Sequence, residues 1–221
     1  MQSKDVGKIL DELANCVMNG DYESVQNVAK KALDAKCDPV VAVEQGLAKG
    51  LKVVGDSFGR GEAFLPDLVQ AAAAMKAGVE IIKTAIPKGF ELKSLGSIVI
   101  GTVEGDIHDI GKSILAAMFE ANGFTVHDLG VDVSSTRFLE TTGEVKPNIV
   151  AMSALLTTTL ARMPEVIKGL GKAGLRQKVK VMVGGAPVTR EWADEIGADA
   201  HGTDASEGII KAKQLVGAKS K

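Results

Sequence analysis

The amino-terminal part of the chain carries apolar residues at the three- and four-residue spacing of amphipathic helices. The first such stretch contains Val6, Ile9, Leu10, Leu13 and Val17. Gly20 favours a helix end, while Asp21 and Asp38-Pro39 are typical helix starts, because aspartate caps free N–H groups and proline suits the first turn. A fourth helical stretch begins around Phe64 and reaches Ile82. Four helices with short joints indicate an antiparallel bundle.

Beyond Pro87 the pattern changes to β-branched runs that alternate with helix-period segments. Strands are expected near residues 97–103, 125–129, 148–154, 179–184 and 198–202, and a last helix from about Ser206 to Val216. Such alternation is typical of a doubly wound parallel sheet with right-handed crossovers. We therefore predict an α/β protein in which a four-helix bundle cap (residues 1–88) and a linker (89–94) precede a flavodoxin- or Rossmann-like five-stranded domain (95–217).

Charge and composition exclude several classes of function. The net charge is -2 with scattered Lys and Arg, and aromatic residues make up 4% of the chain, so nucleic acid is not expected as a partner. No apolar stretch approaches the roughly 20 residues of a membrane helix, and no signal-peptide core is seen. Cys16 and Cys37 lack metal or redox spacing and indicate reduced thiols. We expect a cytoplasmic protein without membrane contact.

Candidate chemistry is concentrated in the loop Gly105 to Lys112, which follows the first predicted strand and precedes a helix. Ligands of open α/β sheets bind at this edge, where the loops diverge. Asp106 and His108 are two residues apart, so both side chains can lie on one side of an extended loop. A carboxylate can then hold one ring N–H of the histidine while the other nitrogen meets a ligand.

Three more loops at predicted strand ends carry small or hydroxylated residues. They contain Ser153 to Thr159, Gly184-Gly185 and Thr203-Asp204. In the strand order 2-1-3-4-5 these loops share a crevice with His108. Paired glycines remove side chains there and let a flat or long ligand approach the backbone.

The single histidine narrows the class of ligand. A bare zinc or iron ion needs three or four protein ligands, and neither His127 nor the cysteines have suitable spacing. One imidazole suffices where a macrocycle already chelates the metal. Haem remains open, although C-x-x-C-H is absent and haem needs no long glycine-lined slot, whereas a corrinoid with a nucleotide tail does.

These residues resemble a known signature. Asp106-x-His108-x-x-Gly111, then 41 residues to Ser153-x-Leu155, then 28 residues to Gly184-Gly185, is similar to the cobalamin-binding pattern of corrinoid methyltransferase proteins and of methionine synthase. The preceding segment from Phe58 to Pro66 resembles the bundle that caps the corrin in those proteins. The threonine run before Leu160 resembles the stand-alone carriers of methylamine systems in particular, beside those for methanol and betaine.

The resemblance implies roles for individual residues. His108 would be the cobalt ligand that replaces the displaced benzimidazole, Asp106 would accept its second N–H, and Thr159 would extend this relay. The cofactor-binding residues implied are Gly105, Asp106, Ile107, His108, Gly111, Ser153, Leu155, Thr157, Gly184, Gly185, Thr203 and Asp204, together with Phe58 and Leu65 from the cap. The cofactor would be cobalamin or a related corrinoid that carries a methyl group.

The implied function is a methyl shuttle between a substrate-specific methyltransferase and a second one acting on a thiol coenzyme or folate. Both partners would be TIM barrels, and the resemblance leaves room for a reductive activase. A mutase subunit or a cobalamin sensor are the alternatives, although residues 1–87 argue against the former and the lack of a basic helix against the latter. A phosphoacceptor receiver shares the topology but needs an aspartate where Ser153 stands.

Plainer interpretations also apply to single residues. Asp106 could act only as a helix N-cap, Gly184-Gly185 could be a tight turn, and Phe58 and Leu65 could be ordinary core. His127, His201 and Trp192 are taken as structural.

Overall fold

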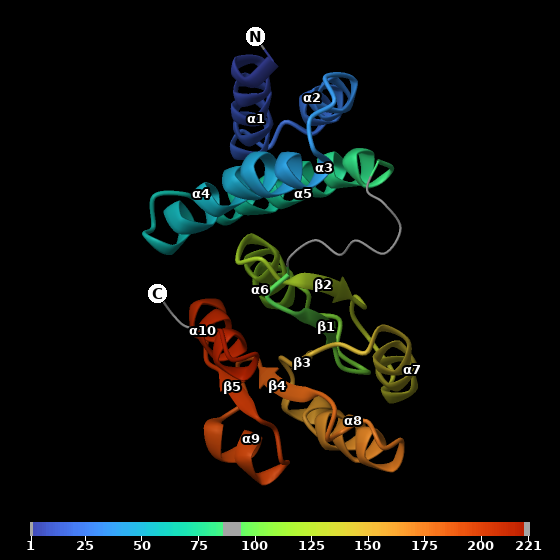
Figure 1. Cartoon of the computed structure of the whole chain (residues 1–221). Helices are drawn as coiled ribbons and strands as arrows, with labels where there is room; N and C mark the ends of the chain where they lie inside the picture. Colours follow the sequence, from blue (N-terminus) through green and yellow to red (C-terminus); the bar gives the residue numbers. More distant parts are fainter. Residues whose placement is uncertain (1, 86–93, 219–221) are drawn as a thin grey trace. The chain divides into compact units, whose positions relative to one another are not determined.

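The computed structural model describes residues 2–85 and 94–218 (Figure 1). The chain divides into two compact units, Met1–Lys93 and Ser94–Lys221. Most of the predicted linker, residues 89–93, lies outside the described residues. Ser94, the last predicted linker residue, belongs to the second unit, where its hydroxyl donates to the Gly96 carbonyl oxygen at 2.8 Å.

The first unit is entirely helical. Its elements are α1 (Gln2–Met18), α2 (Tyr22–Asp34), α3 (Pro39–Val41), the π-helical η1 (Ala42–Leu47), α4 (Ala48–Gly59) and α5 (Leu65–Lys83). The predicted helix starts are confirmed, because Asp21 accepts from Ser24 N at 2.9 Å and Asp38 accepts from Val40 N at 2.8 Å. The sequence pattern predicts a single helix as the third of the unit, and the structure divides it into α3, η1 and α4 without a break in the helical path.

Close packing of η1 against α5 and against α1 explains two glycines in the helical unit. A Cβ added at Gly78 would lie 2.8 Å from the Leu47 side chain, and one at Gly46 would lie 2.9 Å from Leu13. Both leucines are fully buried. The glycines therefore let helix backbones approach closely around an apolar core. Phe58 and Leu65 are half-buried in this unit.

The second unit alternates strands with helices. Its elements are β1 (Ser97–Thr102), α6 (Ile110–Ala121), β2 (Thr125–Asp128), α7 (Ser135–Val145), β3 (Ile149–Ser153), the 3-10 helix η2 (Thr157–Thr159), α8 (Arg162–Lys172), β4 (Lys180–Gly184), α9 (Arg190–Glu195), β5 (Ala200–Gly202) and α10 (Ala205–Leu215). The strands are parallel in the order β2-β1-β3-β4-β5, which confirms the predicted fold. Helices α7 and α8 cover one face of the sheet, and α6 and α10 the other (Figure 1).

The centre of the sheet is buried on both faces. A Cβ added at Gly101 of β1 would lie 2.9 Å from the ring of Phe138, a fully buried residue of α7. The missing side chain therefore makes room for an aromatic ring in the core. Buried strand residues of this kind explain why the parallel strands read as continuous apolar runs.

The register brings four strand ends into one row. Thr102 pairs with Ser153, Ser153 with Gly184, and Gly184 with Gly202. The carboxyl ends of β1, β3, β4 and β5 therefore meet at one edge of the sheet, where the candidate residues lie. In the part of the chain that the structure describes, no helix has the length and apolar character to cross a lipid bilayer.

Candidate functional site

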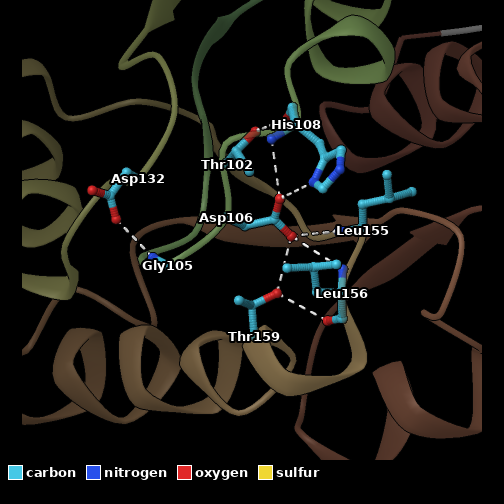
Figure 2. A network of polar contacts seen from close by, with 8 residues as sticks. All are labelled: Thr102, Gly105, Asp106, His108, Asp132, Leu155, Leu156 and Thr159. Atoms are coloured by element: carbon cyan, nitrogen blue, oxygen red, sulfur yellow. Dashed lines mark hydrogen bonds and ion pairs between the residues drawn. The ribbon is translucent and has the colours of Figure 1, made fainter.

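Asp106 is the centre of a hydrogen-bond network at the carboxyl end of β1 (Figure 2). Its side chain is fully buried. Oδ2 accepts from Leu155 N at 2.7 Å, from Leu156 N at 3.1 Å and from the Thr159 hydroxyl at 3.0 Å. Oδ1 accepts from His108 N at 3.1 Å and lies 2.6 Å from His108 Nδ1. The carboxylate thus joins the loops that follow β1 and β3.

The network keeps Asp106 ionised. Burial works to raise the pKa of this carboxyl, but the hydrogen bonds from Leu155, His108 and Leu156 outweigh it and hold the pKa far below its usual range.

Asp106 does not cap the following helix. Helix α6 begins at Ile110 with Asp109 at its N-cap position, so the interpretation of Asp106 as a helix cap is wrong.

His108 is oriented from two sides. Asp106 contacts Nδ1, and the Thr102 hydroxyl donates to the His108 carbonyl oxygen at 2.9 Å. Since an ionised carboxylate only accepts, Nδ1 carries the proton in the neutral ring and the lone pair is on Nε2. Nε2 lies on the side of the ring away from Asp106 (Figure 2), and 46% of the side chain is exposed. His108 therefore offers a directed nitrogen donor to a ligand at this edge.

Thr159 completes the network from η2. The residue is buried, and its hydroxyl lies 3.0 Å from Asp106 Oδ2 and 2.9 Å from the Leu156 carbonyl oxygen. One hydroxyl proton is shared between these two acceptors. The sequence-based expectation that Asp106, His108 and Thr159 lie together matches this geometry. The N–H groups of Leu155 and Leu156 were not anticipated, because backbone donors leave no mark in a residue pattern.

A largely apolar cavity of about 200 Å³ lies beside this network, between the ends of β1, β3, β4 and β5. Its walls include side chains of Ile100, Leu115 and Met182, while glycines at the ends of β4 and β5 leave it open. Gly185 has a φ of +124°, and a Cβ there would collide with the Ala154 carbonyl oxygen. Any other residue at position 185 would be strained, which explains the second of the paired glycines.

The cavity includes only part of the predicted cofactor-binding set. Gly111, Ser153, Gly184, Gly185, Thr203 and Asp204 line it. Gly105, Ile107, Leu155 and Thr157 lie outside it, and Ile107 is 75% exposed. The Thr203 hydroxyl donates to Glu207 at 2.6 Å, and Asp204 caps α10 by accepting from Glu207 N. Phe58 and Leu65 belong to the other unit.

Sequence reasoning assigned no role at the site to Lys112, Asp128 or Asp132. Lys112 lies in the first turn of α6, where its ammonium group contacts Asp109 at 2.8 Å and Asp128 at 2.6 Å. Asp132 accepts from Gly105 N at 2.7 Å (Figure 2). A lysine at a helix start opposes the helix dipole, and that unusual placement is the signal that could have drawn attention to Lys112.

The residues at this edge fit a chelated metal better than a bare one. Within residues 2–85 and 94–218, no group of three or more His, Cys, Asp or Glu side chains could hold a metal ion. A macrocycle supplies its own equatorial ligands, so one imidazole is enough beneath it. The cavity opened by the glycines provides room for an apolar extension of such a ligand.

Comparison with known proteins agrees with this class of site. Two family profiles, both described as a B12 binding domain, match residues 96–210 and residues 9–83. The chain belongs to the B12-binding family, and its cofactor is cobalamin or a related corrinoid.

Relatives match nearly the whole chain. Dimethylamine corrinoid protein 1 of Methanosarcina mazei is 48% identical over 98% of this chain and 99% of the relative. Trimethylamine corrinoid protein 2 of the same organism is 46% identical over 93% and 95%. Among solved structures, the methanol:cobalamin methyltransferase complex MtaBC of Methanosarcina barkeri matches with a TM-score of 0.86 and 29% identity, covering 97% of this chain and 81% of that one. A cobalamin-binding protein of Desulfitobacterium hafniense matches with a TM-score of 0.64 and 35% identity, covering 93% and 98%.

Proposed function

We propose that this protein carries a methyl group on a corrinoid from a methylamine-specific methyltransferase to a second methyltransferase. One observation carries the proposal: a buried carboxylate holds Nδ1 of His108 at 2.6 Å, beside a glycine-opened cavity at the same sheet edge. The similarity to dimethylamine and trimethylamine corrinoid proteins over almost the whole chain supports the substrate class. The quoted relatives are corrinoid proteins, so the mutase and sensor alternatives gain no support from them.

In this proposal His108 would hold the cobalt through Nε2. Asp106 fixes the ring and its tautomer, and Thr159 holds Asp106 in turn. When bound, the corrinoid supplies a cobalt centre that accepts a methyl group and gives it up again. The carboxylate strengthens the imidazole as a donor, and such outer partners typically matter by about 10–100-fold in metal affinity or activity.

The cavity next to Ser153 would hold the nucleotide tail of the corrinoid. Its walls are mostly apolar, and Gly184 and Gly185 present backbone where side chains would block entry. A neutral aromatic base displaced from the cobalt suits such walls. The position of Thr203 and Asp204 on the cavity wall supports a role at its far end.

Two methyltransferases would exchange the methyl group with this protein. The structural match to a corrinoid protein within a methanol:cobalamin methyltransferase complex supports such a partner. We propose that both enzymes are TIM barrels, whose open carboxyl-terminal faces hold substrates, and that a reductive activase serves the same cobalt. We place the exchange in the cytoplasm, which suits the free thiols Cys16 and Cys37.

Histidine coordination is tested with the full-length protein reconstituted with cobalamin. The visible spectrum of the wild type should show a displaced benzimidazole with histidine bound, and His108→Ala should lose the histidine signature. His127→Ala on β2 is the matched control, since that residue lies away from the Asp106 network. An unchanged spectrum in His108→Ala would rule out this residue as the ligand.

The carrier role is tested by omission. Isotope-labelled dimethylamine, trimethylamine, monomethylamine, methanol and betaine are each supplied with the cognate methyltransferase, an acceptor methyltransferase and this protein. Label should reach the acceptor with one of the methylamines and stop when this protein is left out. Transfer that continues without the protein, or label that never leaves any donor, contradicts the proposal.

The roles of Phe58 and Leu65 stay predictions. We propose that they shield the upper face of the cofactor, because both are only half-buried within the helical unit. Replacing each with serine should speed the loss of the reduced cobalt signal in air. An unchanged rate would make them ordinary residues of the bundle.

A further inference from the structure

The loop that carries Asp106 and His108 is tied to the segment after β2 at one of its ends by Asp132. Gly105 N donates to Asp132 Oδ1 at 2.7 Å (Figure 2), and Asp132 N donates to the Asp106 carbonyl oxygen at 2.9 Å. These two bonds enclose the peptide unit that leads into Asp106. The start of the loop is therefore fixed from the side opposite to Leu155 and Leu156.

Lys112 makes a second tie at the other end of the loop. Its ammonium group lies 2.8 Å from Asp109 Oδ1 and 2.6 Å from Asp128 Oδ1. Asp109 directly follows His108, and Asp128 is the last residue of β2. Asp128 Oδ1 also accepts from Gly130 N at 2.9 Å, so the tie continues into the segment that holds Asp132.

The placement of Lys112 indicates a specific purpose. Its side chain is 2% exposed, whereas those of Asp109 and Asp128 are 51% and 37% exposed. The two aspartates could be hydrated without a partner, but a buried ammonium at a helix start is unfavourable without them. The ion pairs therefore serve to hold this geometry rather than to neutralise acidic groups.

Asp132 occupies an equally unusual conformation. Its φ is 52°, a left-handed value that favours glycine, and it faces Gly105 with a φ of 82°. Aspartate is one of the few other residues that tolerate this region. Glycine would adopt the conformation more easily but has no side chain to accept the Gly105 N–H. The strain at Asp132 is offset by the contacts that fix the loop.

We propose that Lys112 and Asp132 are positioning residues for His108, which brace its loop against the segment Asp128–Val133 before the corrinoid binds. This inference rests on the proposed role of His108 as the cobalt ligand. A loop held at both ends presents the imidazole without an ordering step on binding, which favours affinity. Neither residue need touch the cobalt, although Lys112 also lines the cavity.

Lys112→Met and Asp132→Gly each remove one of the two ties of the loop, and two further variants serve as controls. Lys112→Met keeps an apolar stem of similar length but removes the ammonium group. Asp132→Gly keeps the left-handed backbone but removes the acceptor, and Asp132→Asn restores an acceptor oxygen. Lys168→Met on the exposed surface of α8 is the matched charge control. Since Asp132 does not line the cavity, it reports on the loop alone.

The first measurement uses the full-length protein without cofactor. Amide hydrogen exchange of peptides covering residues 104–110 should become at least about tenfold faster in Lys112→Met and Asp132→Gly, because loops with fewer ties open more readily. Asp132→Asn and Lys168→Met should match the wild type. Wild-type exchange in both Lys112→Met and Asp132→Gly would overturn the brace.

The second measurement titrates each protein with cobalamin. In Lys112→Met and Asp132→Gly the dissociation constant should rise about tenfold, the effect expected of outer partners of a metal ligand, and the histidine-bound spectrum should weaken. A change in Lys112→Met alone would show that this lysine acts through the cavity, and would overturn the shared role. If the wild type itself lacks histidine coordination, the proposed function fails, while the exchange data still decide whether the loop is braced.

Discussion

The carboxyl edge of the sheet is built in opposite ways at β1, which we call the polar end, and at β4 and β5, which we call the open end. At β1, a buried Asp106 gathers donors from two loops and leaves no part of its carboxylate unused. At β4 and β5, Gly184, Gly185 and Gly202 contribute backbone and no side chains to the cavity wall. The first end positions one nitrogen, and the second provides space. A cofactor with a metal centre and a long apolar tail requires both, side by side.

The largest expected effect is at the polar end. Asp106→Ala leaves the N–H groups of Leu155 and Leu156 without their acceptor inside the protein, and the Thr159 hydroxyl keeps only the Leu156 carbonyl oxygen. Breaking such a buried charged network should lower the free energy of unfolding by about 3–5 kcal/mol. Urea unfolding of the cofactor-free protein measures this, with Asp194→Ala on the exposed side of α9 as control. A loss as small as that of the control would mean that water replaces the carboxylate.

The open end should respond to an added methyl group. Gly185→Ala forces a left-handed alanine whose Cβ meets the Ala154 carbonyl oxygen, and it should cost about 2–3 kcal/mol. Gly143→Ala in α7 is the matched control, since it has free space and an ordinary φ, and it should gain about 0.5–1 kcal/mol. Thermal unfolding and cobalamin titration compare the two. Equal stability and affinity in both would refute the claim that Gly185 is required by the backbone.

This difference also explains what could be predicted from the sequence. Periodic apolar residues and caps such as Asp21 and Asp38 predict nearly every helix and strand, because burial and capping act locally. The paired histidine and aspartate are found because two residues of spacing keep them together in any extended loop. Each of these signals lies within a few residues of chain.

Contacts between distant loops are the part that the sequence could not predict. Asp132 reaches Gly105 across 27 positions, and Leu155 reaches Asp106 through its backbone. Such pairs depend on which distant loops the folded sheet brings together, and residue spacing within one segment carries no record of that. The π-helical segment Ala42–Leu47, in which Gly46 lies close to Leu13, likewise has no mark in the apolar spacing, which predicts one continuous helix there.

Acid should weaken the polar end before the open one. The folded-state pKa of Asp106 is depressed, so its stabilising contribution is complete at neutral pH and is lost as pH falls below about 5 towards the folded-state pKa. The loss is expected to be on the order of 2 kcal/mol. Unfolding of the cofactor-free wild type and of Asp106→Asn is compared between pH 7 and 3. Identical slopes for the two proteins would show that Asp106 does not dominate the acid response.

A smaller loss is expected from Thr159, which acts on the same carboxylate. Thr159→Val replaces the hydroxyl with a methyl group of similar volume and should lower the free energy of unfolding by about 1 kcal/mol. Thr159→Ser keeps the donor to Asp106 and should retain most of the stability and the histidine-bound spectrum. A serine variant that behaves like the valine variant would mean that the methyl group, and not the hydroxyl, matters at this position.

The smallest effect should come from the far wall of the cavity. The Thr203 hydroxyl bonds to Glu207 near the surface, where its backbone N–H makes a second bond to the same carboxylate oxygen at 2.9 Å. Because that second bond survives in Thr203→Val, we expect a stability change within about 0.5 kcal/mol. Cobalamin affinity should change less than in Gly185→Ala, since valine alters one exposed side chain of the cavity wall and leaves the backbone at Gly185 unchanged. An affinity loss larger than that of Gly185→Ala would mean that Thr203, and not the paired glycines after β4, determines how the nucleotide tail is recognised. It would contradict the proposal that the glycines provide the space for the tail.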